Sequence, residues 1–289
     1  MNILHLFFIV ALLFSSYASL LSASLDPEQI LKSSRVLWSG SSPNSAVGSV
    51  KGQFKGAVQF GVALAGSERI ASLASGGDGI VMDFADGILL SKPESNANLL
   101  LAGNAMTALL RYRADSMGPA GMFFSKPGGH DRTVFNYHVI RGELGFEFGV
   151  QDKPELAARL SMPVDRAVDE AWHVLVARYD GSELTLFLDG QVYGRESVTG
   201  TLRVNNVPLV IGDILQGQID HAALWNRALS DAEITVLSGR RTQLTAGEVA
   251  PEDDRVIADF NGGNYGDWKT KGEAFAQGPA EGVASSANK

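Results

Sequence analysis

The sequence contains no cysteine. This absence excludes disulfide bonds, thiolate metal sites and a lipid-modified cysteine at a signal junction. An exported protein without disulfides depends on an extensive hydrophobic core. The chain has 289 residues, of which 45% are hydrophobic, so it is long enough to build such a core.

Basic residues are also few. The chain has 24 Lys and Arg against 32 Asp and Glu, which gives a formal net charge of −8. A nucleic-acid-binding protein normally shows a basic stripe, and this sequence has none. We therefore expect no nucleic-acid partner, whereas an uncharged sugar or another protein suits this surface.

No Lys or Arg precedes Lys32, yet residues 1–24 otherwise read as a secretory signal peptide. Residues 6–14 form an unbroken apolar run, and small residues with cleavage-compatible spacing follow at 16–18 and 22–24. The alternative is an uncleaved anchor, but serines interrupt the run before the roughly 20 apolar residues that a spanning helix needs. We expect cleavage, no stable membrane insertion afterwards, and a secreted or periplasmic protein.

From about residue 50 the chain consists of short apolar stretches bounded by Gly, Asp or Pro, which is typical of strands. The clearest strand is residues 172–179, and Leu184, Leu186 and Leu188 then alternate with other side chains at the two-residue period of a strand. Asp-Gly pairs at 180–181 and 189–190 predict tight turns, because glycine tolerates the positive φ that these turns require. Many strands without intervening helices predict a mostly β fold, an antiparallel two-sheet sandwich.

Helix signals stand at the two ends of this region. Asp26 and Pro27 predict the start of a helix in a segment of helix and linker, residues 25–49. Ser230 and Glu233 form a capping box for a short closing helix that ends near Gly239. Residues 240–255 are polar and are expected to be a linker.

Residues 50–239 resemble a laminin-G-like, concanavalin A-like jelly-roll domain. The resemblance rests on "VARYDGSELTLFLDGQVYG", then "PLVIGD", then "GQIDHAALWNRALSDAEI". In that family two hairpins with Asp-Gly turns, an Ile-Gly strand and an Ile-Asp strand run in this order into a closing helix. The resemblance implies a jelly-roll fold and a lectin-like role.

Residues 256–289, "VIADFNGGNYGDWKTKGEAFAQGPAEG" and beyond, resemble the segment that opens the catalytic region of glycoside hydrolase family 32, the fructan and sucrose hydrolases. That resemblance implies a propeller with an aspartate nucleophile in a Trp-Met-Asn-Asp-Pro-Asn-Gly motif and a glutamate beside a cysteine. Neither motif is present. About 34 residues cannot build a core alone, so we expect the truncated start of such a module.

Candidate ligand-binding residues are His130, Asp131 and Arg132 in the Gly-rich segment "SKPGGHDR", together with Trp268 in the terminal segment. Loops on rigid sandwiches often carry function, although a polar hairpin loop is the simpler interpretation. His138, His173 and His221 are dispersed without ligand spacing, so we interpret each as a satisfied core or sheet-face residue.

No cofactor is certain from the sequence, and calcium is the first metal to test, because relatives of this fold often bind it through Asp and backbone oxygens. Asp180, Asp189 and Asp213 are the candidate metal ligands. All three are expected at turns, where aspartate also has a structural role.

We predict no catalytic residues. Glycoside hydrolysis needs two carboxyl groups about 5–10 Å apart, and the nearest candidates, Glu143 and Glu147, flank Gly145 on one strand face. Their Cα atoms would lie roughly 13 Å apart, so we interpret them as solvated strand residues. The chain is therefore predicted to be a non-catalytic, carbohydrate-binding accessory domain whose partner is a fructan-type polysaccharide or a cell-surface glycan. The alternatives are an adhesion or protein-interaction module, and a hydrolase that acts only in a longer form.

Overall fold

The computed structural model describes residues 25–239, except residues 129–132, 152 and 154. The chain divides into two units, Met1–Thr242 and Gln243–Lys289, and everything described below belongs to the first. None of the described helices is long and apolar enough to cross a membrane.

The described residues form thirteen strands, three α-helices and two short 3-10 helices. The strands are β1 (Val36–Ser39), β2 (Gly52–Ala63), β3 (Ile80–Ser91), β4 (Met106–Met117), β5 (Ala120–Lys126), β6 (Phe135–Ile140), β7 (Glu143–Phe148), β8 (Ala158–Pro163), β9 (Trp172–Tyr179), β10 (Glu183–Leu188), β11 (Gln191–Ser197), β12 (Val210–Ile211) and β13 (Leu215–Trp225). The helices are α2 (Pro27–Lys32), α3 (Gly66–Ala74), α4 (Asp231–Leu237), η1 (Pro93–Leu99) and η2 (Val164–Arg166).

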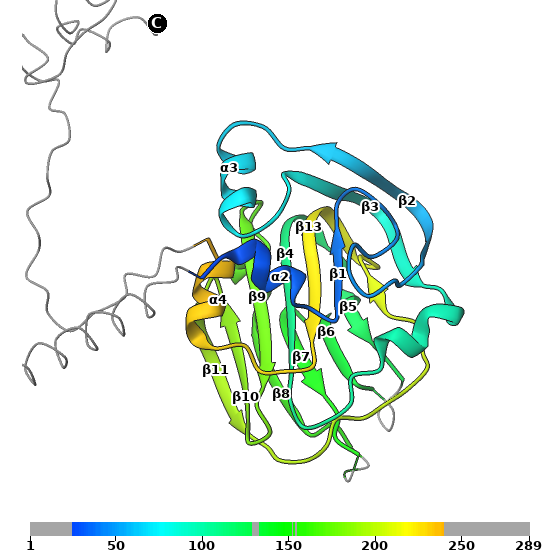
Figure 1. Ribbon diagram of the computed structural model, residues 1–289, viewed down its shortest axis with the longest axis vertical. Coiled ribbons are helices and arrows are strands. Elements are labelled where there is room, and N and C mark those ends of the chain that lie inside the picture. Colours follow the sequence, from blue (N-terminus) through cyan, green and yellow to red (C-terminus); the bar gives the residue numbers. More distant parts are fainter. Residues whose placement is uncertain (1–24, 129–132, 152, 154, 240–289) are drawn as a thin grey trace, which may run out of the picture. The chain divides into compact units, whose positions relative to one another are not determined.

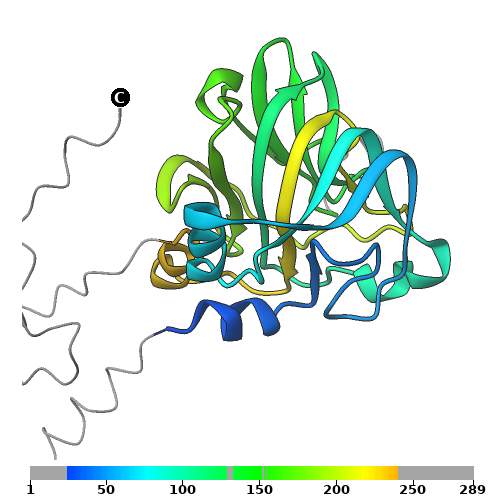
Figure 2. The same cartoon turned by 90° about the horizontal axis from the view of Figure 1, so that it is seen from above.

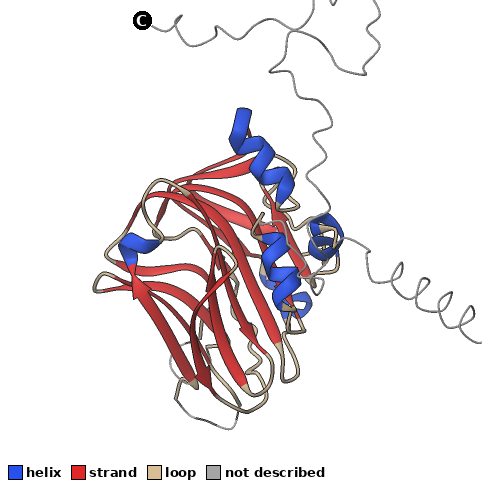
Figure 3. Ribbon diagram, turned by 90° about the vertical axis from the view of Figure 1, so that its left-hand side faces the viewer, coloured by secondary structure: helices blue, strands red, loops and turns tan. Residues whose placement is uncertain are grey.

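Every strand pairing is antiparallel, and the strands follow the order β11-β10-β9-β4-β13-β3-β12-β5-β6-β7-β8, with β1 on β13 and β2 on β3. The two-residue strand β12 pairs with both β3 and β5, so it joins the two layers of the sandwich. At the opposite edge the Arg159 amide of β8 donates to Glu196 of β11 at 2.9 Å. The predicted mostly β, antiparallel jelly-roll sandwich is confirmed, and its two layers nearly close on each other (Figure 3).

The main core lies between the two layers. Tyr137 on β6 and Tyr112 on β4 are fully buried there. The Tyr137 hydroxyl donates to the carbonyl of Ala108 on β4 at 2.9 Å, so a hydrogen bond crosses from one layer to the other. The Tyr112 hydroxyl donates to the Ala167 carbonyl at 2.9 Å, so both of these buried tyrosines fill the core with their hydroxyls satisfied.

A second cluster of buried side chains lies on the outer face of the larger layer, beneath α2 and α4. Figures 1 and 2 show these two helices side by side on that face. Trp225 of β13 is 1% exposed and donates its indole N–H to the carbonyl of Ile30 on α2. The terminal helices therefore cover one face of the sandwich.

The hairpin turns predicted at the two Asp-Gly pairs form, although in the first pair only Gly181, with a φ of 100°, has a positive φ. Arg141 and Gly142, between β6 and β7, have φ angles of 54° and 79°. Asp189 and Gly190, between β10 and β11, have φ angles of 50° and 76°. Two successive positive φ values are the signature of the type I′ turn, which matches the twist of the flanking strands.

Two elements differ from the prediction. The expectation of no helix among the strands was wrong, because α3 separates β2 from β3. Residues 36–39, expected in a segment of helix and linker, form β1, which pairs with β13, and Trp38 in it is 1% exposed. Pairing to a strand almost 200 residues away overrides the weak local pattern of so short a segment.

Candidate functional site

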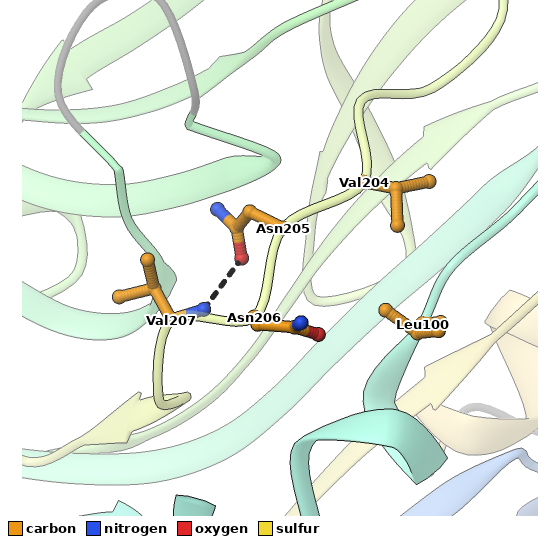
Figure 4. Close-up of a pocket in the computed structure, with 5 residues that line it drawn as sticks. All are labelled: Leu100, Val204, Asn205, Asn206 and Val207. Carbon is orange, nitrogen blue, oxygen red and sulfur yellow. Dashed lines mark hydrogen bonds between the residues drawn. The ribbon is translucent and has the colours of Figure 1, made fainter.

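A pocket of about 580 Å³ lies at one end of the sandwich, where residues 204–207 run toward β12. Leu100, Val204, Asn205, Asn206 and Val207 line it, as Figure 4 shows. Val204 is 44% exposed, so the pocket reaches the surface.

A chain of hydrogen bonds fixes the backbone of this pocket. Asn96, on η1, donates from its carboxamide to the carbonyl of Asn206 at 2.6 Å. The Oδ1 atom of Asn96 accepts from the Ser91 hydroxyl at 2.8 Å, and the same hydroxyl accepts from the Leu209 amide. Ser91 and Asn96 are both buried. The pocket wall is therefore held by residues of β3 and η1.

Lys126 and Pro127 fix the same segment from the end of β5. The Nζ atom of the fully buried Lys126 donates to the Val207 carbonyl at 2.9 Å, and Pro127 accepts from the Asn205 carboxamide at 2.8 Å. Burial lowers the pKa of Lys126 to about 8, because a charged ammonium loses its hydration there. Within the described residues no carboxylate pairs with Lys126.

The two asparagines of the pocket differ in what they can offer a ligand. Asn205 is occupied, since its carboxamide bonds to Pro127 and to the Val207 amide. Asn206 is exposed, and its carboxamide has no hydrogen-bond partner among the described residues. One free amide beside Leu100, Val204 and Val207 combines donors and an acceptor with apolar surface. That combination suits the hydroxyl and C–H groups of an uncharged ligand.

The predicted ligand-binding residues His130, Asp131, Arg132 and Trp268 lie outside the described residues. Their assignment stays a prediction. The segment "SKPGGHDR" nevertheless begins at the pocket, because Lys126 and Pro127 both bond to residues that line it.

The three candidate calcium ligands lie at turns, and two of them are engaged in hydrogen bonds. Asp180 accepts from the Ser182 amide, the Ser182 hydroxyl and the Glu183 amide. Burial raises the pKa of Asp180, but these hydrogen bonds lower it by more, so the pKa lies below its usual value. Asp189 accepts from the Val174 amide at 2.8 Å and lies 2.9 Å from Nδ1 of His173, whereas Asp213 has a φ of 20°.

Within the part of the chain that the structure describes, no three His, Asp or Glu side chains come together as a group that could hold a metal ion. Asp180, Asp189 and Asp213 are therefore not assembled into one site with other such ligands. Calcium binding stays a prediction.

The interpretation of Glu147 as a solvated residue was wrong. Its side chain is 12% exposed, and its Oε1 atom lies 3.7 Å from Nε2 of His138 and 3.5 Å from Nε of Arg159. The three residues stand on adjacent strands, β7, β6 and β8. Arg159 thus lies across this sheet face and pairs with Glu147.

Gly145 separates Glu143 from Glu147 and faces the ring of His138. A Cβ atom at Gly145 would lie 2.9 Å from Cε1 of that ring. The place between the two glutamates is therefore filled by the imidazole. This arrangement leaves no room for a third carboxylate on the same strand.

No periodic pattern or motif in the sequence marks the pocket of Leu100 and residues 204–207. The pair Asn205-Asn206 before Pro208 is typical of a turn, and that was the only signal available.

No curated protein matches the chain. Solved structures do. The binding domain of Paraclostridial Mosquitocidal Protein 1 is similar with a TM-score of 0.53 and 14% identity, over 72% of this chain and 52% of that one. The botulinum neurotoxin serotype D binding domain matches with a TM-score of 0.54 and 9% identity, over 73% and 52%. The receptor binding domain of the botulinum neurotoxin C/D mosaic serotype matches with a TM-score of 0.52 and 10% identity, over 71% and 51%.

At these identities the likeness shows the fold alone, and the chain spans about half the length of the matched domains. The family assignment comes from the sequence. The model of the laminin G type described as the concanavalin A-like lectin/glucanases superfamily matches residues 91–235, which is half of the chain. This range runs from the last residue of β3 through the pocket to α4, so the chain belongs to the concanavalin A-like lectin/glucanase superfamily.

Proposed function

We propose that this chain is an exported, non-catalytic, lectin-like module that binds carbohydrate in the pocket of Leu100 and residues 204–207. The observation that carries the proposal is the free carboxamide of Asn206 at a surface pocket that buried hydrogen bonds hold in place. Family membership supports it, since the superfamily is named for lectins and glucanases. The toxin domains of similar fold are themselves named for binding.

The ligand of this pocket is proposed to be an uncharged sugar of the fructan type. Apolar side chains and one amide line the accessible surface, and the chain carries a net charge of −8, which disfavours acidic glycans. Fructan is the first sugar to test because residues 256–289 resemble the opening of a fructan-hydrolase catalytic region.

A glycan array that includes levan and inulin tests the proposal with the purified chain. Asn206→Ala is expected to weaken binding about tenfold or more, because a sugar hydroxyl would lose its partner. Gln191→Ala removes an exposed carboxamide on β11 and serves as the matched control, which should bind like the wild type. Binding that is unchanged in Asn206→Ala, or no binding to any glycan, would contradict the proposal.

The alternative is a module that binds protein, and one observation favours it. Strand β2 pairs only with β3 among the described strands, and Phe54 in it is 51% exposed. Ile70 and Leu73 of α3 are 69% and 48% exposed. An edge strand with exposed apolar side chains is a common surface for protein contact. A surface protein recovered by pull-down and lost in Phe54→Lys, together with a blank glycan array, would favour this function.

We also propose that the chain is the front end of a longer fructan-hydrolase-like protein. The support is the resemblance of residues 256–289 to glycoside hydrolase family 32. Sequencing the downstream DNA tests it. A coding sequence for a propeller in any frame is expected, and its absence behind a well-supported gene end would refute the idea.

A further inference from the structure

A second cavity, of about 210 Å³, lies between α2, β1 and the loop that follows α3. Leu31, Leu37, Ser39, Ala46, Gly77 and His221 are among the residues that line it. It shares no lining residue with the pocket of Leu100 and residues 204–207.

His221 is the buried polar residue of this cavity. It stands on β13, in register with Ser39 of β1 and Arg111 of β4, and is 1% exposed. Neither ring nitrogen has a hydrogen-bond partner among the described residues. The interpretation of His221 as a satisfied residue was therefore wrong. A buried polar group without a hydrogen-bond partner costs free energy, so we expect the two ring nitrogens to bind a group from outside the protein.

The neighbouring acid does not fill this need. Asp220 is fully buried, and its Oδ2 atom pairs with Nη1 of Arg111. The distance from Nδ1 of His221 to the same oxygen is 3.7 Å, which is longer than a hydrogen bond. Gly77 packs directly on the other carboxylate oxygen, where a Cβ atom would lie only 2.6 Å from Oδ1. The imidazole is thus left facing the cavity.

The remaining lining defines the ligand. Leu31, Leu37 and Ala46 give apolar walls, and Ser39 adds a hydroxyl. Glu28 and Lys32 also line the cavity, but they pair with each other, and both side chains are more than half exposed. These two residues therefore offer a ligand no unpaired charge. Asp78 also lines the cavity, and its exposed carboxylate, which accepts from the Ile80 amide at 3.0 Å, disfavours an anionic ligand.

A hydroxyl group matches the imidazole, because it both donates and accepts, while a neutral imidazole has one donor and one acceptor. The cavity volume corresponds to about seven water molecules in the liquid. The cavity therefore has more room than is filled by one water molecule on each of the two ring nitrogens. A single sugar or cyclic polyol unit presents hydroxyls on its rim and C–H groups on its faces, as these walls require.

We propose that this cavity is a binding site for one uncharged polyhydroxylated molecule of the size of a single sugar unit, with His221 as its hydrogen-bonding anchor. The site is separate from the proposed glycan pocket. It stands whether or not residues 204–207 bind sugar, since it rests on His221 and the cavity alone.

Nuclear magnetic resonance of the full chain, labelled with ¹⁵N in histidine, tests the proposal. Glucose and myo-inositol are the probes, and glucuronate is the charged counterpart. Both neutral probes are expected to shift the ring signals of His221 with a millimolar Kd, because ligands of so few atoms gain little binding energy. Glucuronate should bind at least tenfold more weakly. Equal binding of glucuronate would overturn the uncharged class of ligand.

Two variants assign the effect to this cavity. His221→Phe removes both nitrogens, and Ala46→Leu fills the cavity from its wall without changing His221. Both should weaken binding at least tenfold, and thermal unfolding would show that each is folded. Asn206→Ala should bind the probes here as the wild type does, which separates this test from that of the glycan pocket. If neither probe shifts His221 at tens of millimolar, or if binding survives in both variants, the cavity holds water only and the proposal is overturned.

Discussion

A deeply buried ion pair of the sandwich joins Arg111 on β4 to Asp220 on β13. The two side chains are 4% and 0% exposed, and the guanidinium of Arg111 also stacks 4.5 Å from the ring centre of Trp172. Because both groups lose their hydration, such a pair adds little net stability. Removal of one partner, however, leaves the other charge buried and uncompensated. Removal of one partner is thus expected to destabilise the fold more than replacement of both partners by apolar residues.

Asp220→Ala should lower the free energy of unfolding by about 3–5 kcal/mol, because the guanidinium stays buried without a carboxylate. Urea denaturation measures this change. Asp115→Ala is the matched control, since its carboxylate pairs with Arg113 but is 52% exposed, and it should cost less than about 1 kcal/mol. Similar losses in the two variants would contradict this account of the buried pair.

His173 lies between two carboxylates. Its Nδ1 atom is 2.9 Å from Asp189 and its Nε2 atom is 3.0 Å from Asp169. Burial lowers the pKa of His173, but the hydrogen bonds that its ring makes to the carboxylates of Asp189 and Asp169 outweigh burial, so the pKa is raised. Asp189 also accepts from the Val174 amide, which ties the turn after β10 to β9.

A raised histidine pKa makes the stabilisation pH-dependent. The contribution of His173 is fully present below the unfolded pKa of about 6.5 and is lost as the pH rises through the higher folded value. We therefore expect the loss of unfolding free energy caused by His173→Gln to be larger at pH about 5.5 than at pH about 9. The effect of His173→Gln at the two pH values should differ by about 1 kcal/mol, since both carboxylates are partly exposed.

His138 serves as a control, because its pKa is shifted in the opposite direction to that of His173. Burial lowers its pKa and outweighs the nearby Glu147, which raises it. Its contribution should therefore be lost as the pH falls. The difference between wild type and His138→Gln should grow with rising pH, and equal slopes for the two histidines would refute these assignments.

Hydrogen bonds between residues close in the sequence determine where the closing helix α4 begins. The Ser230 hydroxyl accepts from the Glu233 amide at 3.2 Å, and the Glu233 carboxylate accepts from the Ser230 amide at 2.8 Å. Leu229 and Ile234 are both buried beside this cap. The capping box forms as the sequence predicts.

Ser230→Ala is expected to lower the free energy of unfolding by about 1 kcal/mol, because one helix amide loses its acceptor. Chemical denaturation checks this value. Thr235→Ala, in the same short helix, removes a hydroxyl that donates to the Asp231 carbonyl, and it should change stability by no more than about 0.5 kcal/mol. An unchanged Ser230→Ala would show that packing alone holds α4.

Local signals were weaker for β1 and α3. Residues 36–39 carry apolar side chains that fit a helix or a strand, and pairing with β13 decides between them. The helix α3 leaves Ile70 and Leu73 exposed, so it lacks the buried apolar stripe by which an amphipathic helix is recognised. Both elements therefore depend on contacts that the sequence pattern does not display.

At the scale of the molecule, the two clusters of buried side chains found among the described residues lie within residues 30–237. A chain that ends at Gly239 is therefore expected to keep its melting temperature within a few degrees, since it loses no part of these clusters. Calorimetry of the two lengths measures this. A fall of more than about 8 °C would show that residues 240–289 add about 2 kcal/mol or more to the fold.

The sequence by itself determined the strand-and-turn order, the type I′ turns, the capped helices and the superfamily, because each of these depends on residues close together in the chain. Only the tertiary structure decided where the two pockets lie. Asn96 and Asn206 meet across 110 residues to hold the pocket wall, and Arg111 meets Asp220 across 109 to leave His221 without a partner. Such contacts arise from the packing of distant strands, so no local pattern of side chains encodes them.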